Sequence, residues 1–302
     1  MFKSKNGMSR ALVRRETTAG YLFLLPSLFF FVTFVLYPMF LCLYTSFFDS
    51  NMGKNAVDVF VGLGNYKELF QDKLFLGALK NTVVIVVVAV PTVCAFSLWV
   101  ATAIYDMKPA LTSAFRCIFY LPVVTGSVAV TVVWKWMYNS RYGVFNYLFK
   151  SLGIIDQNIN WLGDARFALW CIILILFTTS VGQPIVLYVS ALGNVDHSLV
   201  EAAEVDGANR RQVFWKIKWA QIMPTTLYIL IITTINSFQC FALIQLLTSG
   251  GPTHSTDTIM YYIYYTAFKL YRYGYGNAMG VVLMVIIAVL SAVQFKLGQR
   301  SD

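Results

Sequence analysis

The stretch EAAEVDGANRR, Glu201 to Arg211, is a charged segment in a chain that is 58% hydrophobic and only 12% charged by composition. Eight charged side chains lie in and around this stretch, within residues 193–219. Burying one charged side chain in lipid costs about 2.5 kcal/mol on insertion scales, so burying all of them would cost on the order of 20 kcal/mol. The segment must therefore be in water. Its charged residues are Asp196, Glu201, Glu204, Asp206, Arg210, Arg211, Lys216 and Lys218.

Long apolar runs lie on both sides of this segment and recur along the whole chain. The mean hydropathy is +0.65, whereas about a quarter of the residues of an average soluble domain are charged. A helix of roughly 20 apolar residues crosses a hydrocarbon core about 30 Å thick. The sequence therefore predicts an all-α, polytopic integral membrane protein with six transmembrane helices. The six runs are Tyr21–Phe48, Thr82–Tyr105, Cys117–Met137, Phe167–Leu192, Ile222–Leu247 and Ala278–Phe295.

The basic residues of the N-terminus predict the orientation of these spans. Lys3, Lys5, Arg10, Arg14 and Arg15 precede the first run. That run is too long for a signal-peptide core and lacks an obvious small-residue cleavage site. We therefore expect a retained first helix with its basic flank inside. Six spans return the C-terminus to the same side, so both termini and the segment 193–219 are predicted to be cytoplasmic. The net charge of +9 is then explained by membrane orientation, with no nucleic acid as partner.

The chain divides into four parts on this topology. Residues 1–20 form a cytoplasmic N-terminal segment. Residues 21–81 hold the first transmembrane helix and an external amphipathic segment, in which Leu63, Tyr66, Leu69 and Phe70 have helical spacing. Residues 82–297 form the transmembrane domain with its cytoplasmic loop 196–219. Residues 298–302 are a cytoplasmic tail.

The cytoplasmic loop carries its own folding signals. Ser198 and Glu201 form an S-x-x-E capping box, which predicts a helix beginning at Ser198. Gly207 stands where a left-handed residue ends a helix, and Asn209 can cap a second one. Ala202 and Ala203 are small enough for another protein to approach the backbone closely. Two interpretations remain open: a docking element for a partner, or an ordinary helical hairpin between spans.

Missing motifs narrow the function further. The sequence has no GxxxxGK[ST] phosphate-binding loop and no His, Cys and carboxylate cluster with metal-ligand spacing. All the acidic residues fall outside the six runs, whereas proton-coupled transporters usually keep a carboxylate at mid-membrane depth. An ion-coupled transporter and a membrane-embedded enzyme are both disfavoured. If the chain moves a solute, a partner must supply the energy, and no metal or cofactor is expected on this chain.

A polar stripe in the fifth run is the candidate solute path. Thr233, Asn236, Ser237 and Cys240 fall at i, i+3, i+4 and i+7, on one predicted helical face. Uncharged hydrogen-bonding groups suit a sugar, and Phe241 could stack on a sugar ring. In the fourth run, Gln183 shares a side with Thr179 and Ser190 near Pro184. The competing interpretation is interhelical packing, since polar residues in membrane helices often hydrogen-bond across helices.

Several segments resemble one transporter family. EAAEVDGANRRQVFWKIKWAQIMPT (201–225) is similar to the EAA loop of ABC importer permeases: Glu-Ala-Ala, Asp-Gly-Ala, then Phe, Ile and Pro at fixed offsets. QIMP replaces the usual Ile-x-Leu-Pro, a mild departure. The similarity extends to the carbohydrate subfamily that includes the maltose and glycerol-3-phosphate permeases, over most of residues 20–297. The other segments are GLGNYKELFQD, ALKNT, FYLPVVTGSVAVTVVWKWMYNSRYG, INWLGD and LIQLLTSGGPTHST.

The resemblance implies a MetI-like type I permease of a bacterial cytoplasmic membrane. Such a subunit would pair with a second, homologous permease subunit and with two copies of a cytoplasmic ATPase, which bind ATP and Mg²⁺. An extracytoplasmic solute-binding protein would deliver the solute, a neutral mono- or oligosaccharide or, alternatively, glycerol-3-phosphate or a related polyol phosphate. The resemblance also implies that Glu201, Ala202, Ala203, Asp206 and Gly207 form a coupling helix docking on the ATPase. It places the sugar-contacting face of the maltose permease on the Thr233–Cys240 stripe.

Overall fold

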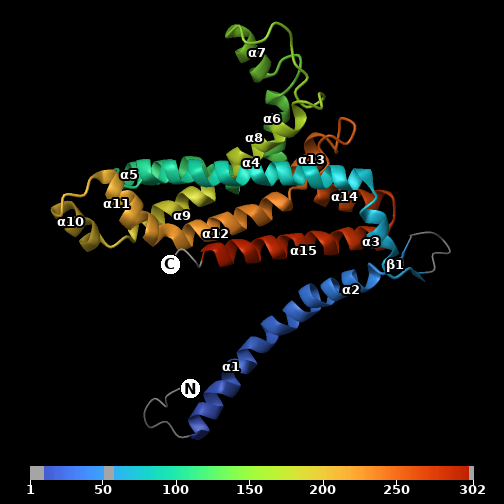
Figure 1. The fold of residues 1–302 in the computed structure, drawn as a ribbon, viewed down its shortest axis with the longest axis horizontal. Coiled ribbons are helices and arrows are strands. Elements are labelled where there is room, and N and C mark those ends of the chain that lie inside the picture. Colours follow the sequence, from blue (N-terminus) through green and yellow to red (C-terminus); the bar gives the residue numbers. More distant parts are fainter. Residues whose placement is uncertain (1–9, 51–57, 299–302) are drawn as a thin grey trace.

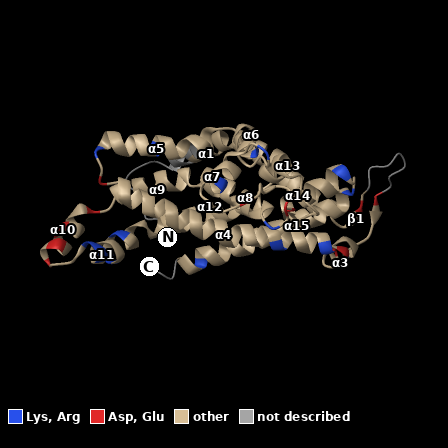
Figure 2. Cartoon of the chain, turned by 90° about the horizontal axis from the view of Figure 1, so that it is seen from above, with Lys and Arg blue, Asp and Glu red and all other residues tan. Residues whose placement is uncertain are grey.

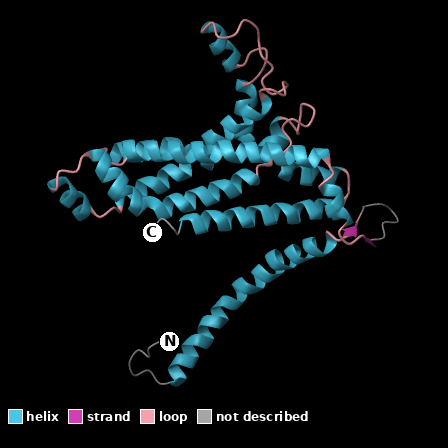
Figure 3. Cartoon of the chain, viewed as in Figure 1, coloured by secondary structure: helices cyan, strands magenta, loops and turns pink. Residues whose placement is uncertain are grey.

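The computed structural model describes residues 10–50 and 58–298, and it is almost wholly helical (Figure 1, Figure 3). Lys3, Lys5 and residues 299–302 of the predicted tail lie outside the described residues. One two-residue antiparallel pair departs from the all-α expectation: β1 (Phe48–Asp49) with β2 (Val59–Phe60). The helices are α1 (Arg10–Phe31), η1 (Val32–Leu36), α2 (Tyr37–Thr45), α3 (Gly64–Leu69), α4 (Lys73–Ile104), α5 (Pro109–Val124), α6 (Ser127–Met137), α7 (Val144–Ser151), α8 (Ala168–Ser180), α9 (Gly182–Gly193), α10 (His197–Val205), α11 (Arg210–Val213), η2 (Phe214–Lys218), α12 (Trp219–Phe238), α13 (Ala242–Leu247), α14 (Ile259–Tyr264), η3 (Tyr265–Lys269) and α15 (Tyr273–Gly298).

A bundle of long helices forms the body of the chain. In Figure 1, α4, α5, α9, α12 and α15 run side by side, with α10 and α11 at one end and α3 and β1 at the other. α4 is a 32-residue helix, about 48 Å long at 1.5 Å per residue, and it packs against both α9 and α12. Its buried face includes Val93, Val100 and Ile104, in one cluster with Ile185 and Tyr188 of α9 and Ile222 of α12. Charged residues gather mostly toward the two ends of the bundle (Figure 2).

The predicted spans are mainly helical, and one of them is sharply bent. Five stretches of the described residues are long and apolar enough to cross a membrane: Thr17–Thr45, Lys73–Ile104, Ala168–Gly193, Arg210–Leu247 and Tyr273–Gly298. The third predicted span, Cys117–Met137, is not one straight helix, because α5 and α6 meet at 95°. Thr125 (ψ 126°) and Gly126 (ψ 142°) have extended backbones between them. Six spans result if this bent pair counts as one.

Two other spans are interrupted without a large bend. α8 ends at Ser180 and α9 begins at Gly182, where a Cβ atom would lie 2.3 Å from the Phe119 carbonyl of α5. Only glycine allows α5 and α9 to approach so closely. The Ser97 hydroxyl of α4 donates to the Val181 carbonyl at this break, with an O–O distance of 3.2 Å. α12 ends at Phe238, and α13 starts only at Ala242.

The first transmembrane helix diverges from the bundle (Figure 1). The hydrophobic window of Thr17–Thr45 is 0% buried within this chain. Its C-terminal end is held on the bundle: α2 packs on α15, where the Asn277 amide donates to the Thr45 hydroxyl at 2.7 Å. The amphipathic segment predicted over residues 63–70 is α3, with Leu69 buried and Leu63 and Phe70 exposed.

Candidate functional site: a coupling loop and a polar cavity

The loop between α9 and α12 folds into two short capped helices. Asp196 caps α10: its carboxylate accepts hydrogen bonds from the Ser198 amide (2.9 Å) and hydroxyl (2.8 Å). The hydroxyl bond holds the pKa of Asp196 below its usual value. The predicted capping box at Ser198 was therefore wrong, because the carboxylate two residues earlier takes the capping position. α10 accordingly begins at His197.

The end of this helix matches the prediction. Gly207 has φ +84°, the left-handed conformation that glycine adopts at low cost. The Ala208 amide donates back to the Ala203 carbonyl at 2.9 Å, which closes the turn. Asn209 and Gln212 then form a reciprocal capping box at the start of α11. The segment is thus a rigid helix–turn–helix at one end of the bundle.

The side chains of α10 are turned outward. Glu201, Ala202, Asp206 and Gly207 are exposed, and Ala203 is partly buried. Val205, which the sequence patterns did not single out, is 87% exposed. An apolar side chain so exposed in water, among alanines and glycine, is available to a partner surface. Its signal in the sequence was only an apolar residue in an otherwise polar and small stretch.

A polar cavity of about 160 Å³ lies between α5, the α8–α9 break and α12. Of the predicted path residues, Gln183, Thr233 and Asn236 line it, together with Thr179 and Ser180. Pro184 has no amide hydrogen, so the Ser180 carbonyl lacks its usual helical partner at the cavity wall. The lining therefore offers amides and hydroxyls without any formal charge, beside apolar side chains that include Leu187, Ile229 and Ile232.

The remaining predicted path residues do not line this cavity. Thr233, Asn236 and Ser237 lie within α12, but Cys240 lies beyond its end at Phe238, so the expected helical face does not extend to Cys240. Cys240 and Phe241 pack in an apolar cluster with Ile172, Ile244 and Tyr261. Ser237 is buried, 2% exposed. Ser190, on the same predicted side as Gln183, is also outside the lining.

A second cavity adjoins the first. It measures about 440 Å³ and shares Gln183 and Leu187 with the polar cavity. Its other lining includes Arg116, Cys117 and Tyr120 of α5. The Arg116 Nε is buried without a hydrogen-bond partner. Sequence reasoning missed this arginine, because it stands on a different span from the polar stripe.

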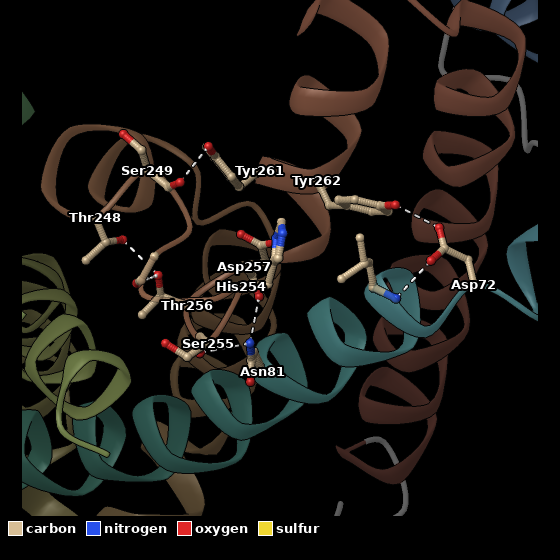
Figure 4. A network of polar contacts seen from close by, with 12 residues as sticks. Asp72, Asn81, Thr248, Ser249, His254, Ser255, Thr256, Asp257, Tyr261 and Tyr262 are labelled. Carbon is tan, nitrogen blue, oxygen red and sulfur yellow. Dashed lines mark hydrogen bonds and ion pairs between the residues drawn. The ribbon is translucent and has the colours of Figure 1, made fainter. Parts of the chain in front are cut away.

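At the opposite end of the bundle, α4 holds the segment that follows α13 (Figure 4). The Asn81 amide donates to the carbonyls of Ser255 (3.1 Å) and Asp257 (3.0 Å). Asp72 accepts hydrogen bonds from the hydroxyls of Tyr262 (2.7 Å) and Tyr275 (2.8 Å). Two of the motif segments, GLGNYKELFQD…ALKNT and LLTSGGPTHST, thus meet in one polar network.

One hydrogen-bonded histidine–carboxylate pair lies inside this network. His254 Nδ1 is 2.6 Å from the Asp257 carboxylate, which is almost fully buried. Burial raises the pKa of Asp257, and the bond with His254 opposes that rise. Over residues 10–50 and 58–298, no three His, Cys, Asp or Glu side chains come together as a metal site.

This arrangement, a membrane helix bundle with a capped loop at one end, belongs to a known class. Residues 75–302 match the family model of binding-protein-dependent transport system inner membrane components. The chain belongs to this family: it is a multi-pass permease subunit of an ABC transporter and not itself an enzyme. The predicted family and MetI-like fold are confirmed.

The chain is similar to several named transport proteins. The chain is 33% identical to the lactose transport system permease protein LacF of Rhizobium radiobacter, over 94% of this chain and 95% of that one. It is 29% identical to the sn-glycerol-3-phosphate transport system permease protein UgpA of Agrobacterium fabrum, covering 93% and 94%. Its fold is similar to a chain of a bacterial alginate ABC transporter in complex with an alginate pentasaccharide-bound periplasmic protein. That match has a TM-score of 0.82 at 24% identity and covers 95% of this chain and 96% of the other.

Proposed function

We propose that this chain is the membrane-spanning subunit of an ATP-driven sugar importer and moves a neutral mono- or oligosaccharide by alternating access. The observation that carries the proposal is the uncharged cavity of Gln183, Thr233 and Asn236, built by the helices that flank the exposed loop. Sugar hydroxyls need donors and acceptors without formal charge, and this lining supplies both. α9 and α12 connect α10 to this cavity, so they would transmit a movement of α10 to the cavity wall.

We propose that the same geometry serves three kinds of partner. Two copies of a cytoplasmic ATPase, which bind ATP and Mg²⁺, would receive the exposed face of α10 around Glu201, Ala202, Asp206 and Gly207. A second, homologous permease subunit would cover the apolar side chains of α1, which are exposed along the helix within this chain. An extracytoplasmic solute-binding protein would deliver the sugar at the α3 end. Both termini would be on the cytoplasmic side of a bacterial cytoplasmic membrane.

A phosphorylated solute is the second candidate. Arg116 brings a guanidinium with an unsatisfied Nε to a cavity that shares Gln183 with the polar one. Guanidinium groups pair well with phosphate. This favours glycerol-3-phosphate or a related polyol phosphate, as in the name of the relative UgpA.

Reconstitution tests the proposal. The chain is co-expressed with its candidate permease partner and ATPase, and ATP hydrolysis is measured in proteoliposomes with the binding protein and a panel of sugars and glycerol-3-phosphate. We expect one solute class, with its binding protein, to stimulate hydrolysis. Solute movement by this chain without any ATPase would contradict the proposal.

A matched pair of variants tests the docking face. Val205→Asp places a charge on the exposed face of α10, and Leu63→Asp makes the same change at the other end of the bundle, where Leu63 is 68% exposed. We expect Val205→Asp to release the ATPase during purification and Leu63→Asp to retain it. Equal retention by both variants would exclude α10 as the docking element.

A further inference from the structure

One side-chain contact joins the loop 196–219 to the end of α4. Lys218 ends η2, where the loop returns to α12, and Tyr105 follows the last residue of α4. The Lys218 ammonium lies 4.5 Å from the centre of the Tyr105 ring and donates to its hydroxyl. The two residues are 113 positions apart in the chain.

The surroundings of this pair are open and polar. A cavity of about 600 Å³ separates α10 and α11 from the end of α4, and both Tyr105 and Lys218 line it. Asp106, His197, Glu204 and Arg210 line the same cavity. Apolar contacts cross beside it, since Val200 and Trp219 pack against the cluster that contains Ile104.

Hydrogen bonds across this cavity are few. The Asp196 amide donates to the Gln221 side chain, which ties the start of the loop to α12. Asn209 and Gln212 bond to each other within the loop. Within the described part of the chain, the hydrogen bond from Lys218 to Tyr105 links the segment 196–219 to the end of α4. α4 would otherwise follow the loop only through apolar packing.

We infer that Tyr105 and Lys218 are positioning residues that make α4 move with the coupling loop. The inference rests on the proposed function, in which the ATPase displaces α10. The flexible stem of lysine lets the ammonium stay on the Tyr105 hydroxyl while the loop shifts, so the pair tolerates sliding better than tight packing does. α4 runs unbroken from this contact to Asn81 and Asp72, which hold the external network. A displacement at Lys218 would therefore reach the outer face along one helix.

The test measures sugar transported per ATP hydrolysed by the reconstituted importer. Lys218→Met and Tyr105→Leu each remove the contact, and the double variant removes both partners. Lys216→Met is the matched control. It removes the same charge from η2, and the Lys216 side chain is exposed. Tyr105→Phe keeps the ring and removes the hydroxyl that accepts from Lys218.

We expect each single variant to lower transport per ATP about two- to tenfold, the size of a single hydrogen bond. The double variant should be no worse than either single one, because coupled residues do not add. Tyr105→Phe should lose about as much as Tyr105→Leu, because both remove the accepting hydroxyl, and Lys216→Met should stay near the wild type. Complex yield and thermal stability should be unchanged, which separates positioning from a purely structural role.

Two results would overturn the inference. One is an unchanged ratio in Lys218→Met and Tyr105→Leu, or losses in the two that add. The other is a Tyr105→Phe variant that stays near the wild type, because the hydrogen bond would then not be what joins the loop to α4. Absence of any ATP-dependent transport in the wild type would instead refute the proposed function, so the two failures are distinguishable.

Discussion

Asn81 on α4 and Asp257 in the segment after α13 are 176 positions apart, yet the Asn81 amide donates to the Asp257 carbonyl at 3.0 Å. The same amide also reaches the Ser255 carbonyl. One side chain thus holds two backbone groups of a turn that contains left-handed residues, among them Thr253 and His254. Such a backbone persists only where its surroundings determine it.

Loss of the Asn81 amide should therefore loosen this turn. We expect Asn81→Ala to destabilise the folded chain by about 1–3 kcal/mol, the cost of leaving buried polar groups without a partner. Asn81→Asp, which is isosteric but turns an acceptor toward the two carbonyls, should be worse. Thermal unfolding of the assembled complex and the rate of proteolysis within residues 248–258 would measure both. If the alanine variant were the less stable of the two, packing rather than hydrogen bonding would explain the role of Asn81.

Gly207 offers a test of the backbone of the coupling loop. A Cβ atom there meets nothing within 4 Å, so a substitution is opposed only by φ +84°. Gly207→Ala should cost about 1–2 kcal/mol in local stability. Gly207→Asn should cost less, because asparagine visits the left-handed region more readily. ATP hydrolysis stimulated by the loaded binding protein should fall further in Gly207→Ala than in Gly207→Asn. Equal losses would mean that the exposed surface at Gly207 matters more than its backbone.

The sequence predicted this loop well because its signals are local. Gly207, Asn209 and the charges around them act within a few residues, and the structure has both caps where we expected them. The cap at the start of α10 was misplaced, since Asp196 and Ser198 are both good N-cap residues and the sequence does not rank them.

The interior of the bundle was harder to predict. A run of apolar residues gives the length of a span but not the extended backbone at Gly126 or the end of α12 at Phe238. The polar stripe therefore split: Thr233 and Asn236 line the cavity, and Cys240 packs elsewhere. The packing of α5 on α9 places Arg116 at the wall of the second cavity. The residue pattern of one span cannot predict such a contact between two spans.

Asp72 should make stability depend on pH at the acidic end. Burial raises the pKa of its carboxyl, but hydrogen bonds from Tyr262, Tyr275 and the amides of Leu74 and Phe75 outweigh this effect, so the pKa lies below its ordinary value of 3.8. A group with a lowered pKa in the folded state stabilises fully above its unfolded value, and the contribution is lost as pH falls through the folded pKa. The stabilisation by Asp72 should therefore be complete above pH 3.8 and decline below it.

Asp72→Asn removes the titrating group and keeps its shape. We expect the variant to be less stable than the wild type at pH 7 and the difference to shrink as the pH falls below 4, in thermal unfolding of the purified complex. Asp164 is a useful control, since Arg166 lowers its pKa to about 2 at a partly exposed site outside this network. A stability difference that stayed constant down to the lowest pH would show that the Asp72 charge contributes nothing.

The polar cavity makes the last prediction, which separates solute contact from helix packing. Gln183→Leu and Asn236→Leu remove exposed hydrogen-bonding groups from the cavity wall. If they contact the sugar, each should raise the sugar concentration for half-maximal transport about fivefold, corresponding to about 1 kcal/mol per hydrogen bond, with little change in thermal stability. Cys240→Ala, in the apolar cluster behind the cavity, should instead lower stability and leave the sugar dependence near wild type. The opposite pattern, in which the cavity variants unfold earlier and the sugar dependence responds only to Cys240, would assign Gln183 and Asn236 to packing and move the solute path to the other side of α12.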